Sequence, residues 1–226
     1  MGKLFIVPMV LYLLGTTIIG RLDTGYPIGY ACVVCIIAIV ISWLWLQAEK
    51  SDRECVRFHW RVLPGVVIGL IGIALWIVLC NLGVEQAVAQ YLPKFMRPEA
   101  RVGYNPFEAL PNTGAVVAFI AVRLFGIAII VPIAEELFWR GFLLRWLIDP
   151  EWERVGIGDY TFSSCAIVTA MFTLAHPEWL AAATYCLLIN GLLYWKRDLW
   201  QCIVAHAVSN AALVAYVLYA GAWELW

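Results

Sequence analysis

The chain has 226 residues, of which 63% are hydrophobic and only 14% are charged, and its mean hydropathy is +0.83. These values lie far outside the range of soluble domains, and a net charge of −1 without an acidic or basic tail argues against a nucleic-acid partner. The composition predicts an all-α fold, a polytopic helical bundle in a membrane.

Seven apolar segments follow one another along the chain, separated by shorter polar stretches. At about 20 residues per span, the length allows roughly six to eight transmembrane helices, and the pattern predicts about seven in a single membrane domain, 1–226. The polar stretch 91–113 is rich in Pro, Asn and Gly and is expected to be a loop. The expected spans are 4–20, 29–46, 62–82, 114–146, 162–176, 180–195 and 199–222.

Lysine and arginine are distributed unevenly between the two sides that these spans define. Because short cytoplasmic loops accumulate basic residues, a ten-to-four excess predicts a cytoplasmic N-terminus and an external C-terminus. We expect a multi-pass integral membrane protein of the bacterial inner membrane. The cytoplasmic set is Lys3, Lys50, Arg53, Arg57, Arg61, Arg140, Arg145, Arg154, Lys196 and Arg197, against Arg21, Lys94, Arg97 and Arg101 outside.

The stretch VPIAEELFWRGFLLRW in the fourth segment places Glu135, Glu136 and Arg140 where a lipid-facing helix carries no charge. An ionisable group at the centre of a bilayer costs about 2.5 to 3.5 kcal/mol on insertion scales, so such groups usually face a protein interior. Glu136 and Arg140 are four residues apart and can form an ion pair, whereas Glu135 points about 100° away. The alternative is that both carboxylates neutralise arginines at a cytoplasmic helix end.

Two of the three histidines lie in apolar segments. His176 ends TAMFTLAH, and His206 lies in CIVAHAVSNAAL, four residues before Asn210 and therefore on the same helix face. A single histidine in a membrane is more often a packing residue than a catalyst. Two histidines, an amide and an unpaired glutamate in one bundle form a candidate site.

Three short motifs occur in order on successive apolar segments. EELFWR fits EExxxR, FTLAH fits FxxxH, and HAVSN fits HxxxN. Together they resemble the CPBP intramembrane proteases, that is, the type II CAAX prenyl endopeptidases and their bacterial relatives. The VPIAEE opening also resembles members associated with exosortase protein-sorting systems. The resemblance covers 114–222, the CPBP-like catalytic core, whereas 1–113, with the first three spans, carries no recognised motif.

The resemblance implies an intramembrane endopeptidase that hydrolyses a peptide bond. It assigns Glu135 and His176 to activation of a water, and His206 and Asn210 to stabilisation of the resulting oxyanion. A carboxylate in a low-dielectric site suits a general base, and preorganised donors are most effective where water is excluded. The resemblance also implies three supporting residues, Glu136, Arg140 and Phe172.

The expected substrate is a peptide or protein C-terminus, lipidated or not, and the other expected partner is membrane lipid. Glu135, His176 and His206 could instead be three zinc ligands with an open position for water. We favour metal-free activation, because Asn210 beside His206 is better explained as an oxyanion donor. The assignment requires the fourth helix to continue past Pro132, since otherwise Glu135 and His176 would lie on opposite sides of the bundle.

Two other classes of protein remain open at this point. A non-catalytic immunity or scaffold protein on the same fold would use Glu136 and Arg140 for packing, but would have no use for the remaining polar residues. A small proton-coupled transporter would also place Glu and His in the membrane, usually with a repeat symmetry that this sequence lacks.

Overall fold

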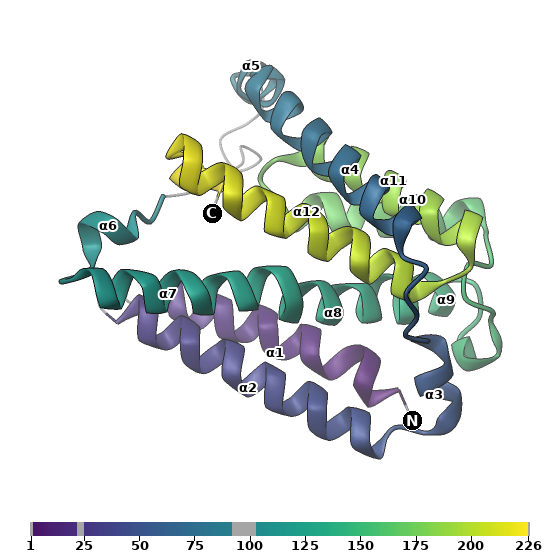
Figure 1. Cartoon of the computed structure of the whole chain (residues 1–226). Coiled ribbons are helices and arrows are strands. Elements are labelled where there is room, and N and C mark those ends of the chain that lie inside the picture. Colours follow the sequence, from purple (N-terminus) through teal and green to yellow (C-terminus); the bar gives the residue numbers. More distant parts are fainter. Residues whose placement is uncertain (1, 22–24, 92–102, 226) are drawn as a thin grey trace.

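The computed structural model describes residues 2–21, 25–91 and 103–225, and every regular element in these ranges is a helix (Figure 1). The predicted all-α fold is confirmed. Residues 92–102 of the predicted loop 91–113 lie outside the described residues. The part that is described contains a short helix, α6 Pro106–Ala109, whose N-cap Asn105 accepts a hydrogen bond from the Phe107 amide.

Each expected apolar segment corresponds to a helix, with small differences at the ends. The major helices are α1 Lys3–Ile19, α2 Tyr26–Gln47, α4 Leu63–Asn81, α10 Phe162–Leu174, α11 Trp179–Lys196, α12 Leu199–Ala220, and a long composite helix between α4 and α10. Short helices in the connections were not predicted: α3 Lys50–Cys55, α5 Val84–Ala89, α6, η4 Trp152–Arg154 and η5 Trp223–Leu225.

Four of the described helices are long and apolar enough to cross a bilayer: α2, α4, the composite helix Thr113–Trp146 and α12. Two more, α1 and α10, are apolar but have only 17 and 13 residues. The structure therefore shows a polytopic helical protein, and the count of about seven spans stays a prediction.

The composite helix consists of α7 Thr113–Phe125, η2 Gly126–Ile130, α8 Val131–Glu136, η3 Leu137–Leu143 and α9 Leu144–Trp146. It continues through Pro132, as the site assignment required. Pro132 has no N–H, and its ring would press on the carbonyl four residues earlier in a regular α-helix. The preceding segment η2 is a π-helix in which the Val131 amide bonds to the carbonyl of Gly126, and this wider turn accommodates the proline.

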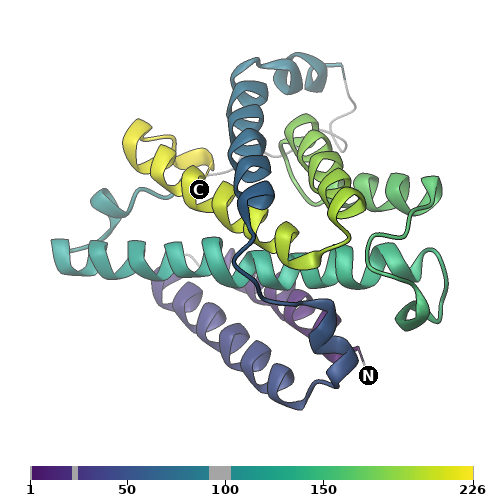
Figure 2. The same cartoon turned by 45° about the vertical axis from the view of Figure 1, so that its right-hand side comes forward.

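The composite helix divides the bundle. Helices α1 and α2 lie on one side of it, and α4, α10, α11 and α12 lie on the other (Figures 1 and 2). On the first side, Gly126 faces the Tyr30 ring and Gly141 faces Phe5, and a Cβ at either glycine would fall within 2.6 Å of these side chains.

On the second side, α4 crosses α12 at two glycines four residues apart. A Cβ at Gly65 would lie 2.7 Å from the Gln201 carbonyl oxygen, and one at Gly69 would clash with the carbonyl oxygen of Ala205. Small residues at this spacing let membrane helices approach closely. The contact brings α4, from the half of the chain without a recognised motif, against the helix that carries His206.

The segment predicted to be helical over 162–176 ends earlier in the structure. Helix α10 stops at Leu174, and His176 lies in the connection to α11. Pro177 gives the reason, because a proline disfavours the α-helical conformation of the residue before it. His176 is therefore presented from a chain reversal rather than from a helix face.

Candidate active site

A cavity of about 550 Å³ lies within the bundle, lined by residues of α1, α2, α4, the composite helix, α10, the α10–α11 connection, α11 and α12. Its wall contains the four residues assigned to catalysis from the sequence. Glu135 comes from α8, His176 from the connection after α10, and His206 and Asn210 from α12. Residues more than 70 positions apart in the chain thus face one space.

The two adjacent glutamates point in different directions. The Glu136 side chain is completely buried, whereas Glu135 keeps 7% of its surface exposed and lines the cavity. Glu135 Oε2 has no hydrogen-bond partner among the described residues. A buried carboxylate oxygen without a protein partner is costly unless water or a ligand contacts it. Glu135 is thus available to a molecule in the cavity.

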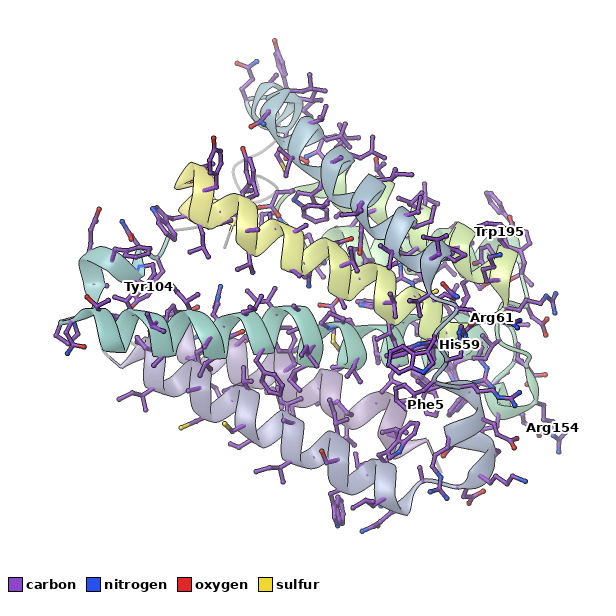
Figure 3. All side chains as sticks on the ribbon, in the orientation of Figure 1. Phe5, His59, Arg61, Tyr104, Arg154 and Trp195 are labelled. Carbon is purple, nitrogen blue, oxygen red and sulfur yellow. The ribbon has the colours of Figure 1, made fainter. Side chains whose placement is uncertain are left out.

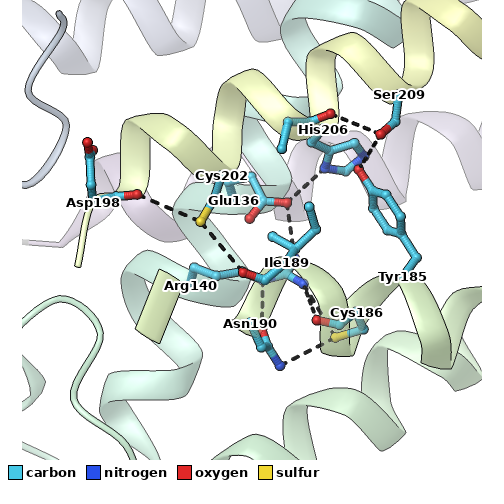
Figure 4. A network of polar contacts seen from close by, with 11 residues as sticks. Glu136, Arg140, Tyr185, Cys186, Ile189, Asn190, Asp198, Cys202, His206 and Ser209 are labelled. Atoms are coloured by element: carbon cyan, nitrogen blue, oxygen red, sulfur yellow. Dashed lines mark hydrogen bonds and ion pairs between the residues drawn. The ribbon is translucent and has the colours of Figure 1, made fainter. Parts of the chain in front are cut away.

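Glu136 belongs to a buried polar network behind the cavity wall (Figure 4). Its Oε1 accepts a hydrogen bond of 3.0 Å from Arg140 Nη1, which confirms the predicted ion pair. The rest of the guanidinium is also satisfied, because Nε donates to Asn190 Oδ1 and Nη2 donates to the Cys186 carbonyl. Arg140 has no exposed surface, so its charge depends entirely on these partners.

The same network holds His206. Nδ1 of the ring lies 2.8 Å from Glu136 Oε1, and because the carboxylate is the acceptor, Nδ1 carries the donated proton (Figure 4). The edge of the ring meets Tyr185 at a centroid distance of 5.7 Å. The Tyr185 hydroxyl donates to Ser209, whose hydroxyl lies within hydrogen-bonding distance of the Gly69 carbonyl. These contacts fix the orientation of the imidazole.

His176 is positioned by the residue that begins its motif. Nδ1 lies 2.8 Å from the Phe172 carbonyl oxygen and must donate to it, and the imidazole stacks on the Phe172 ring at 4.5 Å. The Phe172 ring also lies 5.3 Å from the Arg140 guanidinium. Trp76 of α4 meets the imidazole edge-on at 5.8 Å. The FxxxH spacing therefore has a direct structural basis.

Asn210 is held by the π-helical segment. Its Nδ2 donates a hydrogen bond of 2.9 Å to the Ile127 carbonyl oxygen in η2. A π-helix changes the hydrogen-bond partners of its carbonyls, so that one of them can accept a side-chain donor. An amide nitrogen has two protons, and the second stays available to a group in the cavity.

Glu135, His176 and His206 are the candidate zinc ligands, and all three line the cavity. Within the described part of the chain, however, no three His, Cys, Asp or Glu side chains come close enough together to hold a metal ion. The arrangement does not fit the three-ligand site, and no step of the proposed mechanism is assigned to a metal.

Sequence reasoning missed three residues that support the site: Trp76, Tyr185 and Ser209. Trp76 touches His176, Tyr185 touches His206, and Ser209 joins Tyr185 to the backbone of α4. The glycine spacing of α4 was the available signal, because it indicates a close helix contact. Nothing in the sequence indicated which helix that contact would involve.

Residues 117–212 match the family model described as "Type II CAAX prenyl endopeptidase Rce1-like". No curated protein and no solved structure matches the chain. The matched segment includes the composite helix from residue 117, His176 and most of α12, so it contains all three motifs. Together with the apolar helices, the match indicates an integral membrane protein with a peptidase-type core. The resemblance drawn from the motifs is thereby confirmed for residues 117–212.

Proposed function

We propose that this protein is an intramembrane endopeptidase, with residues 114–222 as its catalytic core, and that Glu135 is the general base. The observation that supports this most strongly is the difference between the two glutamates. Glu136 holds Arg140 and His206 through Oε1 in a completely buried network, whereas Glu135 faces the cavity; the Oε2 atom of each has no partner among the described residues. A non-catalytic protein would gain nothing from placing a second carboxylate, outside the ion pair, in the wall of a buried cavity.

The attacking water is held by two acceptors in this proposal. His176 donates through Nδ1 to the Phe172 carbonyl, so the neutral ring has an unprotonated Nε2. A water that donates one proton to Glu135 and the other to Nε2 keeps a lone pair for attack on a peptide carbonyl. Glu135 takes the proton as the carbon–oxygen bond forms, and later returns it to the leaving amine.

His206 and Asn210 stabilise the negative charge that develops on the carbonyl oxygen. The second amide proton of Asn210 serves as one donor, and Nε2–H of a protonated His206 serves as the other. Glu136 accepts from Nδ1 of that ring and thereby stabilises its charged form.

The charges of the site balance under this assignment. Two carboxylates, Glu135 and Glu136, match two cations, Arg140 and protonated His206, and the cavity lining adds one charge of each sign, Arg123 and Glu178. Proton transfer to Glu135 removes one negative charge while the oxyanion gains one, so the buried net charge stays the same throughout attack. A low-dielectric site favours a reaction that relocates charge without creating it.

The finer features of the protein are proposals of the same kind. We propose about seven spans, a cytoplasmic N-terminus, an external C-terminus and a bacterial inner membrane. The substrate is a peptide or protein C-terminus, lipidated or not, that reaches the site within surrounding lipid. Residues 1–113 contribute packing to the core through Trp76 and the glycines of α4.

The test is cleavage of a peptide library by the purified full-length protein, with the Glu135→Ala variant as the control. We expect cleaved peptides with the wild type and none with the variant. Cleavage that persists in Glu135→Ala would assign the activity to a contaminant or to another group. Failure of every peptide in the library, in protein shown to be folded, would favour the scaffold alternative.

Chelation tests the choice of metal-free chemistry. A chelator should leave cleavage unchanged, and elemental analysis of the chelated, active protein should find no stoichiometric zinc. Parallel loss of zinc and activity would overturn the metal-free mechanism.

A further inference from the structure

We define the two ends of the bundle by the helices that begin or end there. The first face is the end at which α1, α4, α10 and α12 begin and α2, α9 and α11 end. The second face is the opposite end. His59, Arg61 and Arg154 lie at the first face, and Tyr104 lies at the second (Figure 3).

The cavity runs from Glu135 toward the second face. Four of its lining residues mark that end: Gly20 directly follows α1, Tyr26 is the first residue of α2, Glu178 directly precedes α11, and Leu225 lies beyond α12. Of the described residues that line the cavity, none comes from the connections at the first face.

On the other side of Glu135, the bundle is filled. The Glu136–Arg140 pair has no exposed surface. Beyond it, toward the first face, the core is closed by Phe5, Leu144 and Leu199, whose exposed fractions are between 0% and 1%. A substrate can therefore reach Glu135 from the second face, and the first face is blocked by close-packed side chains.

Basic residues mark the first face as cytoplasmic. Outside the helix interiors, the described part of the second face contains one lysine or arginine, Arg21. Juxtamembrane lysine and arginine set the orientation of helical membrane proteins, and the side that carries more of them stays in the cytoplasm. The first face contains Lys3, Lys50, Arg53, Arg57, Arg61, Arg145, Arg154, Lys196 and Arg197.

We propose that the active-site cavity opens away from the cytoplasm, so that the substrates are peptide segments already exposed on the external side of the membrane. This inference rests on the proposed peptidase function for the identity of the ligand, but its geometry is independent of activity. Asn210 lies ten residues before the end of α12, or about 15 Å from the second face at 1.5 Å per residue.

That depth restricts the form of the substrate. An extended chain covers about 3.3 Å per residue, so roughly five unfolded residues must enter the cavity to bring a peptide bond to Asn210 and Glu135. A flexible chain end or juxtamembrane segment of an exported protein meets this requirement, whereas a folded surface loop does not.

The test is thiol labelling in sealed membrane vesicles of opposite orientation, with a membrane-impermeant maleimide. Gly20→Cys reports the rim of the cavity, Leu213→Cys its interior, and Ser51→Cys the first face. The wild type supplies the background of native thiols. Burial raises the pKa of the Cys55 thiol, the native cysteine at the first face, and this slows its reaction because the thiolate is the reactive form.

We expect Gly20→Cys and Leu213→Cys to be labelled in right-side-out vesicles only, and Ser51→Cys in inside-out vesicles only. Labelling of the two cavity positions from the cytoplasmic side, or of Leu213→Cys from neither side while Gly20→Cys reacts, would overturn the inference. None of these outcomes depends on peptide cleavage. A protein that labels as expected but cleaves nothing would contradict the proposed function and leave the external opening intact.

Discussion

Glu135 and Glu136 are neighbours in the chain, yet they belong to two different regions of the molecule. Glu136 lies in the buried network with Arg140, Asn190 and His206, in which a carboxylate is stabilised by fixed donors. Glu135 lies outside this network, in the cavity wall. The comparison shows how a single residue step along a helix, a rotation of about 100°, can separate a group that maintains the fold from a group available for chemistry.

The largest effect that this comparison predicts is on catalysis at the cavity wall. Glu135→Gln keeps the side-chain volume and removes the base, so cleavage should fall by about 10²–10⁴, the usual contribution of general-base catalysis. The thermal unfolding temperature should change little. Glu136→Gln is the matched control, and it should lower the unfolding temperature because Arg140 stays buried without its counterion. If the two variants behaved alike, the separation of roles would be wrong.

The second prediction concerns stability of the buried network. Arg140→Ala leaves Glu136 buried without its cation, and breaking a buried pair in this way typically costs about 3–5 kcal/mol. We expect a marked loss of folded protein in size-exclusion chromatography and a lower unfolding temperature in detergent. Arg154→Ala removes an arginine whose side chain is 83% exposed, and it should have no measurable effect. A fully stable Arg140→Ala protein would refute a structural role for the pair.

The third prediction returns to the cavity wall, at Asn210. Removing one oxyanion donor typically lowers kcat by about 10²–10³, so Asn210→Ala should lower kcat and kcat/KM together. The lost bond to the Ile127 carbonyl should cost stability only about 1 kcal/mol. Leu213→Ala, which removes an apolar lining side chain, serves as the comparison. An effect of Asn210→Ala on KM alone would make Asn210 a binding residue instead.

The smallest effect is expected where the two regions meet, at Phe172. Phe172→Leu keeps the backbone carbonyl that orients His176 but removes the stacked ring. A stacked aromatic pair contributes about 0.5–1.5 kcal/mol, so kcat should fall by roughly two- to tenfold. Steady-state kinetics with a peptide found in the library screen measures this. Unchanged kcat would show that the hydrogen bond to the carbonyl is sufficient to position His176.

The sequence predicted those parts of the site that depend on spacing along one helix. The Glu136–Arg140 pair followed from a separation of four residues, and the different direction of Glu135 followed from a rotation of about 100° per residue. The contact between Glu136 and His206 joins residues 70 positions apart and depends on how α8 and α12 pack. No local pattern contains that information.

The same limit explains the differences in the fold. The uniformly apolar composition of 162–176 predicts one helix, but Pro177 ends the regular structure before His176. The π-helical segments were not predicted either. One of these segments ends shortly before Pro132, and they contain Gly126 and Gly141, whose close contacts with Tyr30 and Phe5 depend on how the bundle packs.

The π-helical segment Gly126–Ile130 also determines which residues of the composite helix face the cavity. The cavity is lined by every fourth residue of this helix, at Arg123, Ile127, Val131 and Glu135. In a regular α-helix, positions four apart drift by about 40°, so Glu135 would be turned about 120° away from Arg123. The wider turn of a π-helix rotates less per residue and offsets most of that drift. One column of side chains therefore remains aligned along the cavity, and deletion of a single residue within the segment would turn Arg123 and Glu135 onto different faces.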